Sequence, residues 1–220
     1  MKRPIVIIAA VVLMASALPT FAQSRAFEVS GYVNRVDPNG NGVFDGPQSI
    51  DNVDVNFDAA TGYGIALNIF WGDRISTEFA GSSVEPDVAF RANNPALPVL
   101  TRGQLRMIPI TAVLQYHFIP NGTVDPYVGA GAAYVLFDNV KNFGDLNDVR
   151  FSSVDFKDDA GFVVNAGASV RLTQRLALYL DGKYVPVKSN AKATVITGPQ
   201  SEAKIDVNPL MFAGGLTLRF

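Results

Sequence analysis

The sequence predicts an all-β protein, an eight-stranded antiparallel transmembrane up-and-down β-barrel. Apolar residues alternate with small or polar residues along most of the chain, which is the pattern of a β-strand with two different faces. The connections between these segments alternate between short turns and long polar stretches, as they do in membrane barrels. After residue 22, no apolar run reaches the length of about 18 residues that a membrane-spanning helix needs, so a helical membrane protein is excluded.

The first 22 residues form a candidate signal peptide. Lys2 and Arg3 give a basic start, residues 5–18 are an apolar run, and small residues up to Ala22 fit a cleavage site. A membrane anchor is the alternative, but the run is short for a span of about 20 residues. We therefore expect a signal peptide at 1–22 and a mature barrel over 23–220.

Composition excludes several classes of function. The 220 residues are 48% hydrophobic and 17% charged, which is too apolar for a disordered chain. The net charge of −2 falls to about −4 without Lys2 and Arg3, so nothing favours nucleic acid. There is no cysteine, which excludes disulfides and thiolate metal sites. Residues 37–48 resemble a calcium loop only in part, because Gln48 stands where such loops have a bidentate Glu. We expect no metal and no cofactor.

Eight segments carry the alternation, with boundaries uncertain by a few residues. They are 26–36, 60–71, 74–81, 108–119, 126–137, 160–172, 176–186 and 205–220. Residues 72–73, 120–125 and 173–175 are short turns, whereas 37–59, 82–107, 138–159 and 187–204 are long and are expected to be loops.

The two faces of each segment indicate the surrounding solvent. In 60–71, Tyr63, Ile65 and Leu67 share one face, and glycine, alanine and Asn68 share the other. The bore of an eight-stranded barrel is narrow, so the small face fits inside and the bulky face meets lipid. Closure also pairs every backbone group, as hydrocarbon requires. Aromatic residues near strand ends are expected to form girdles at the membrane interfaces; they are Trp71, Tyr116, Phe118, Tyr127, Tyr184 and Phe220.

With the N-terminus periplasmic, the inward side chains divide into two levels. The upper lumen is expected to be apolar and to include Val113, Val135, Phe137, Val163, Val185 and Met211. A charge plug is expected below, formed by Glu78, Arg171, Asp181, Lys183 and Arg219. Three prolines near outer strand ends, Pro109, Pro186 and Pro209, cannot donate to a ladder. They mark places where the wall could open, although they could also simply end strands.

Several stretches resemble the OmpW family of outer-membrane barrels. The closest is PYVGAGAAYVLFD over 126–138, preceded by AVLQYHF over 112–118. The closing strand from Asp206 also resembles the family's, and Gly215, Leu218 and Phe220 match the assembly signal of outer-membrane barrels. Leu210 departs from the family pattern, which often has an aromatic residue there, and so does Ile108, which precedes Pro109. These departures put ligand preference in doubt more than fold.

The resemblance implies a location and a function. It implies an integral outer-membrane protein of a Gram-negative bacterium, in contact with lipid, lipopolysaccharide and the assembly machinery. It also implies a porin-like channel for small hydrophobic or amphiphilic molecules that leave sideways through the wall. A structural or stress-related barrel, with loops used by external partners, is the alternative, and a soluble ligand-binding barrel is a further one.

An enzyme is not expected from the sequence. His117 is the only histidine, and no serine lies near it on its own strand, whereas serine lipases need a serine beside a histidine. A serine on a neighbouring strand stays open at this point.

Overall fold

The computed structural model describes residues 26–39, 41–44, 53–92, 101–120, 122–138, 151–156, 158–195 and 201–220. The predicted signal peptide and parts of the predicted long loops lie outside these ranges. Within them, no helix has the length and apolar character needed to cross a membrane.

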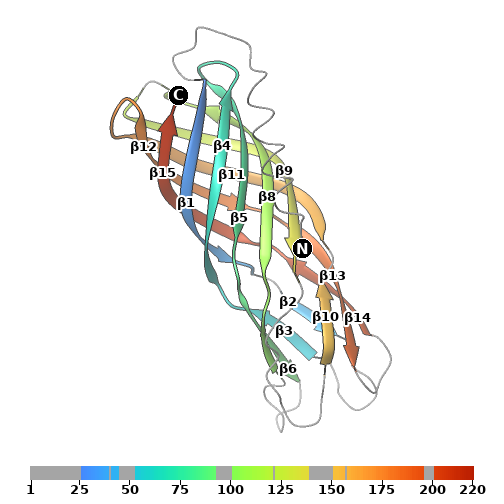
Figure 1. Ribbon diagram of the computed structural model, residues 1–220. Coiled ribbons are helices and arrows are strands. Elements are labelled where there is room, and N and C mark those ends of the chain that lie inside the picture. The colour runs from blue at the N-terminus through green and yellow to red at the C-terminus, as the bar shows by residue number, and fades with distance from the viewer. Residues whose placement is uncertain are drawn as a thin grey trace, which may run out of the picture.

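Eight antiparallel strands close into a barrel, in the order β1-β15-β12-β11-β9-β8-β5-β4 (Figure 1). Their bounds are β1 Phe27–Asp37, β4 Ala60–Phe70, β5 Ile75–Ser83, β8 Met107–His117, β9 Val124–Phe137, β11 Asp159–Arg171, β12 Leu176–Tyr184 and β15 Leu210–Arg219. The last strand pairs with the first, from Glu28 opposite Arg219 to Asp37 opposite Leu210. The predicted barrel is confirmed, and its strand bounds agree within a few residues except that the last strand starts at Leu210 and not at 205.

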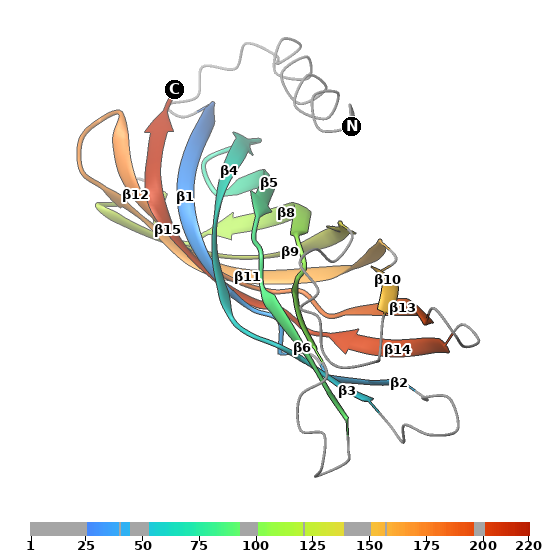
Figure 2. The ribbon, with the colours of Figure 1, turned by 60° about the horizontal axis from the view of Figure 1, so that its bottom comes forward.

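The long segments predicted as loops carry seven further strands. They are β2 Asn41–Phe44, β3 Val53–Phe57, β6 Asp87–Ala92, β7 Thr101–Gln104, β10 Phe151–Phe156, β13 Val187–Val195 and β14 Ser201–Val207. They form a second sheet at the end of the barrel opposite the short turns (Figures 1 and 2). We call this sheet the extension sheet and this end of the barrel the extension end. The prediction of unstructured loops was wrong for these residues, because the hairpins continue past the barrel.

Short breaks separate the barrel strands from this second sheet, and four of them contain a proline. Pro38 follows β1, Pro86 lies between β5 and β6, Pro186 between β12 and β13, and Pro209 between β14 and β15. A proline lacks the N–H that a ladder needs. The breaks therefore fall where the backbone cannot keep pairing on both sides.

The bulky face of the barrel strands points outward. Tyr63, Ile65 and Phe212 are 70%, 61% and 60% exposed, and such a belt is stable only against hydrocarbon. The inward face carries small and polar residues, as predicted. Ile69 departs from the pattern, since it is buried although it belongs to the outward series of β4.

Candidate functional site

A charged layer crosses the middle of the bore. Lys183 on β12 places its Nζ 2.8 Å from Oε1 of Glu78, which lies on β5 in the opposite wall. Lys183 also forms an ion pair with Asp181, and all three residues are buried. Both carboxylates share one cation, so the ion pairs connect the opposite walls across the bore.

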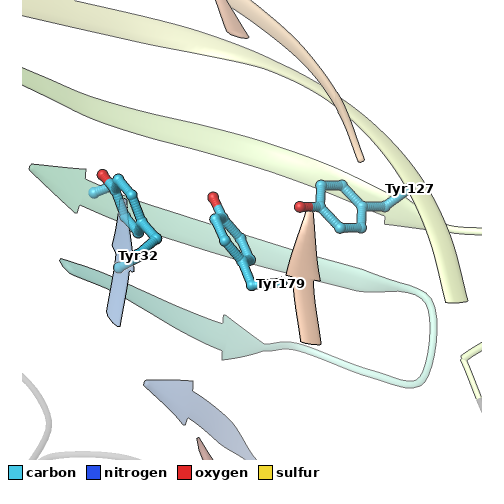
Figure 3. Packing of buried hydrophobic residues seen from close by; sticks show 5 residues of the cluster. Tyr32, Tyr127 and Tyr179 are labelled. Carbon is cyan, nitrogen blue, oxygen red and sulfur yellow. The ribbon is translucent and has the colours of Figure 1, made fainter. Parts of the chain in front are cut away.

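Three tyrosines complete this charged layer, and Figure 3 shows their rings in a row. The Tyr179 hydroxyl donates to Glu78 Oε2 at 3.1 Å and accepts from Lys183 Nζ at 3.1 Å. The Tyr127 hydroxyl donates to Asp181 Oδ2 at 3.0 Å, and the Tyr32 and Tyr179 rings lie 5.5 Å apart. The prediction that Tyr127 joins an interfacial girdle was wrong, because its side chain points into the bore in step with Asp125 on β9.

A second polar level lies nearer the short turns. Arg219 Nε is 2.8 Å from Glu28 Oε1, and Arg219 donates to Ser169 Oγ at 2.7 Å. These contacts join β15 to β1 and β11 rather than the far wall. Arg171, also predicted for the plug, is only half-buried at the end of β11. Glu78, Asp181 and Lys183 therefore meet in one layer, and Arg219 and Arg171 lie below it.

His117 has a serine and an aspartate beside it on neighbouring strands. Its Nε2 lies 2.9 Å from Ser76 Oγ on β5, and its Nδ1 lies 2.9 Å from Asp125 Oδ2 on β9. This is the hydrogen-bond order of a serine-hydrolase triad. The sequence could not show it, because the three residues lie on three strands.

The position of this group indicates a structural role. The Ser76 hydroxyl is buried and already engaged, since it lies 2.9 Å from His117 Nε2 and donates to Gln115 Oε1 at 3.4 Å. The rings of Phe70 and Tyr127 pack against the imidazole, with centroids at 5.0 and 5.3 Å. The three hydrogen-bonded side chains connect β5, β8 and β9 at the base of the barrel.

The upper lumen contains an apolar ring above the charged layer. It consists of Val36, Val84, Met107, Val135 and Val185, each at most 1% exposed. Of the residues predicted for this lumen, Val135 and Val185 belong to the ring, buried Val163 and Met211 lie on the same inward faces, and Phe137 is half-buried. Val113 lies lower than expected, because its Cα partner on β5 is Glu78.

Beneath the apolar ring, three buried polar side chains escaped the sequence reasoning. They are Asn34, Ser82 and Thr111, and all three are buried. Asn34 and Ser82 each come two residues before a ring residue, Val36 and Val84, and Thr111 lies four residues along β8 from Met107. The period-two pattern places them inward, but only the pairing of the strands shows that they lie on one side of the bore. We call this set the polar crescent.

The three predicted prolines differ in what they do to the wall. Pro109 lies inside β8 and not at its end, and the ladder to β5 lacks pairs only between Gly81–Ile110 and the bridge Val84–Met107. Pro209 lacks a donor but its carbonyl accepts from Val185 N at 3.1 Å, which keeps that seam joined.

Pro186 borders a longer interruption. The β11–β12 ladder ends at Val164 opposite Tyr184, although β11 continues to Asp159 in full pairing with β9. Beyond Pro186, the next ladder between these two parts of the chain joins β10 to β13 and begins at Phe156 opposite Ala191. Its register differs by one residue from that of the β11–β12 ladder. Among the described residues, 160–163 therefore have a ladder pairing only with β9. We call this interruption the β11–β12 seam.

Sequence comparison gives the chain a family. The sequence model described as the OmpW family matches residues 24–220. The chain belongs to the OmpW family. It is 26% identical over 222 residues to outer membrane protein W of Vibrio cholerae, covering 98% of this chain and 99% of that protein. It is 28% identical over 156 residues to the outer-membrane protein y4mB of Sinorhizobium fredii, covering 70% of this chain and 63% of that protein.

Structure comparison supports the fold of this OmpW-family chain. The crystal structure of the outer membrane protein OprG from Pseudomonas aeruginosa matches with a TM-score of 0.76 at 19% identity, over 90% of this chain and 97% of OprG. With the family and its outer-membrane relatives, the barrel is an integral protein of the outer membrane.

Proposed function

We propose that this OmpW-family protein admits small hydrophobic or amphiphilic molecules through the outer membrane by passive diffusion, with sideways exit from the upper lumen. The charged layer of Glu78, Lys183 and Asp181 carries this proposal. A solute that enters from the extension end reaches the apolar ring and then meets buried ion pairs. Burying apolar surface of the solute in the upper lumen is favourable by about 25 cal/mol per Å². Passing the charged layer is unfavourable, because it would break buried ion pairs.

We propose the β11–β12 seam as the exit. Few backbone hydrogen bonds have to break there, because Pro186 has no N–H and residues 160–163 have no ladder pairing with β12. Val163 and Val185, at its end, are inward and fully buried, so the seam borders the apolar ring. On the outside it opens to the belt that meets lipid. This route requires neither catalysis nor a cofactor, and we propose none.

A structural barrel without transport is the second candidate. Val135, Val163 and Val185 are 0% exposed, which favours a bore filled by its own side chains. In that case the outward face would serve lipid and lipopolysaccharide, and Gly215, Leu218 and Phe220 the assembly machinery, as expected from the sequence. The two candidates differ in whether the seam has to open.

A reversible disulfide across the seam tests the proposal. Residues 163 and 185 are the next positions after the last pair of the β11–β12 ladder, so Val163→Cys with Val185→Cys places two thiols at facing inward positions. The chain has no other cysteine. The matched control is Ser30→Cys with Thr217→Cys, which are inward Cα partners in the continuous β1–β15 ladder, below the charged layer.

The assay is uptake of small alkanes, aromatics and amphiphiles by cells with and without the protein. We expect uptake to rise with the protein, to fall on oxidation of the 163–185 pair and to return on reduction. Oxidation of the 30–217 pair should leave it unchanged. Equal uptake with and without the protein would overturn the transport proposal, and uptake insensitive to the 163–185 disulfide would overturn the seam.

A further inference from the structure

The polar crescent is an uncharged hydrogen-bonding surface between the charged layer and the apolar ring. Asn34 Nδ2 donates to Ser82 Oγ at 3.1 Å. This contact reaches from β1 across β4 to β5, and β4 has Gly62 opposite Asn34. Thr111 lies on the next strand, β8, opposite Ala80, which is one inward position from Ser82. The three side chains thus follow one side of the bore.

Among the described residues, two polar atoms of the crescent lack a hydrogen-bond partner. Asn34 Oδ1 and Thr111 Oγ1 are fully covered and unpaired within the described part of the chain, and their residues are 1% and 3% exposed. An unpaired polar atom in a protein interior is costly, so such atoms call for a ligand or another explanation. Their place directly under the apolar ring points to the head group of a solute whose tail packs above.

The chemistry of the surroundings selects the head group. The cation of Lys183 is already shared by Glu78 and Asp181, so it is not available to an anionic head group. Asn34 Oδ1 can only accept a hydrogen bond, and the threonine hydroxyl can accept or donate one. A neutral hydroxyl, which donates and accepts, matches both atoms.

We propose that the polar crescent binds the hydroxyl group of neutral single-chain amphiphiles, such as medium-chain primary alcohols, while the alkyl chain lies against the apolar ring. This inference rests on the proposed uptake function and names its solute class. The hydroxyl donates to Asn34 Oδ1 or forms a hydrogen bond with Thr111 Oγ1, and the apolar ring holds the chain. Alkanes and ethers enter the same lumen, but they have no proton to donate.

The test compares uptake of octan-1-ol with that of methyl heptyl ether, which has a similar length and shape but no donor. The variants are Thr111→Val, which keeps the shape of the side chain, and Asn34→Leu. The control is Thr217→Val, the same replacement lower in the bore, where the hydroxyl lies 2.7 Å from Ser30 Oγ. Barrel folding is checked for each variant by its heat-dependent shift in gel mobility.

We expect Thr111→Val and Asn34→Leu each to lower the alcohol-to-ether uptake ratio about three- to tenfold, the range of one hydrogen bond. Thr217→Val should leave the ratio unchanged. A ratio in the folded Thr111→Val and Asn34→Leu proteins equal to that of the unmodified protein would overturn the head-group site alone. If neither solute enters faster with the protein than without it, the uptake function itself fails.

Discussion

Replacing Lys183 by methionine removes the cation from the charged layer and keeps most of the side-chain volume. Glu78 and Asp181 are then left buried without a positive partner. Breaking a buried ion pair from one side costs about 3–5 kcal/mol, and Lys183 has both a carboxylate in the opposite wall and one on its own strand. We expect the free energy of unfolding of Lys183→Met to fall by about that amount.

A double variant measures how much of this loss in the free energy of unfolding comes from the Glu78–Lys183 ion pair. In Glu78→Gln with Lys183→Met, Asp181 is the only member of the set that keeps a charge. It still accepts hydrogen bonds from Tyr127 and from Asn165 Nδ2, the latter at 2.9 Å. The double variant should therefore be less destabilised than the sum of the single variants, with a coupling of about 1–3 kcal/mol.

The assay is urea unfolding of the barrel in lipid vesicles, followed by tryptophan fluorescence and gel mobility. Trp71, the only tryptophan, lies outside the bore at 60% exposure and reports on release from lipid. Single-channel recording of Glu78→Ala with Lys183→Ala should show ion conductance absent from the unmodified protein. Additivity of the two substitutions within about 0.5 kcal/mol, with unchanged conductance, would refute the idea that this pair ties and obstructs the bore.

Three further predictions concern the barrel wall. Gly215→Ala should reduce the stability of the barrel by about 1–3 kcal/mol, because a Cβ there would lie 2.1 Å from the Gly31 carbonyl oxygen. Gly214→Ala, where the nearest atom lies at 3.8 Å, should be tolerated. Urea unfolding measures both variants, and equal stabilities would contradict this reasoning. Arg219→Ala should destabilise the barrel yet leave ion conductance unchanged, since the Glu78–Lys183 pair remains; a conducting variant would place the obstruction lower. A lipid-soluble thiol reagent should modify Ile65→Cys and spare Asn165→Cys, and the reverse result would invert the two faces.

The membrane fold could be read from the sequence because its signal is local. The period of two in 60–71 or 160–172 places each side chain on one of two faces without knowledge of any partner strand. A narrow bore then decides which face points inward. The prediction for Tyr127 was wrong because it relied on a position near a strand end as the signal of an interfacial girdle. The period of two, which puts Tyr127 on the same inward face as Asp125, was the better guide.

The extension sheet escaped the same reasoning for a physical reason. Six of its seven strands have seven residues or fewer, and alternation over so few residues is a weak signal. The seventh, β13, has nine residues, but only its terminal valines are large and apolar. Their pairing follows from hairpins that continue beyond a proline break, as β12 does through Pro186 into β13.

The sequence by itself determined the eight barrel strands, their two faces, the family resemblance and many of the residues that enter the bore. Only the tertiary structure decided which of those residues meet. Glu78 and Lys183, or Ser76, His117 and Asp125, are brought together by the order and register of the strands around the barrel. The end of the β11–β12 ladder at Val164 and Tyr184 is likewise visible only in the structure, where β11 continues to pair with β9. Register is a property of pairs of strands, so no single segment of the sequence specifies it.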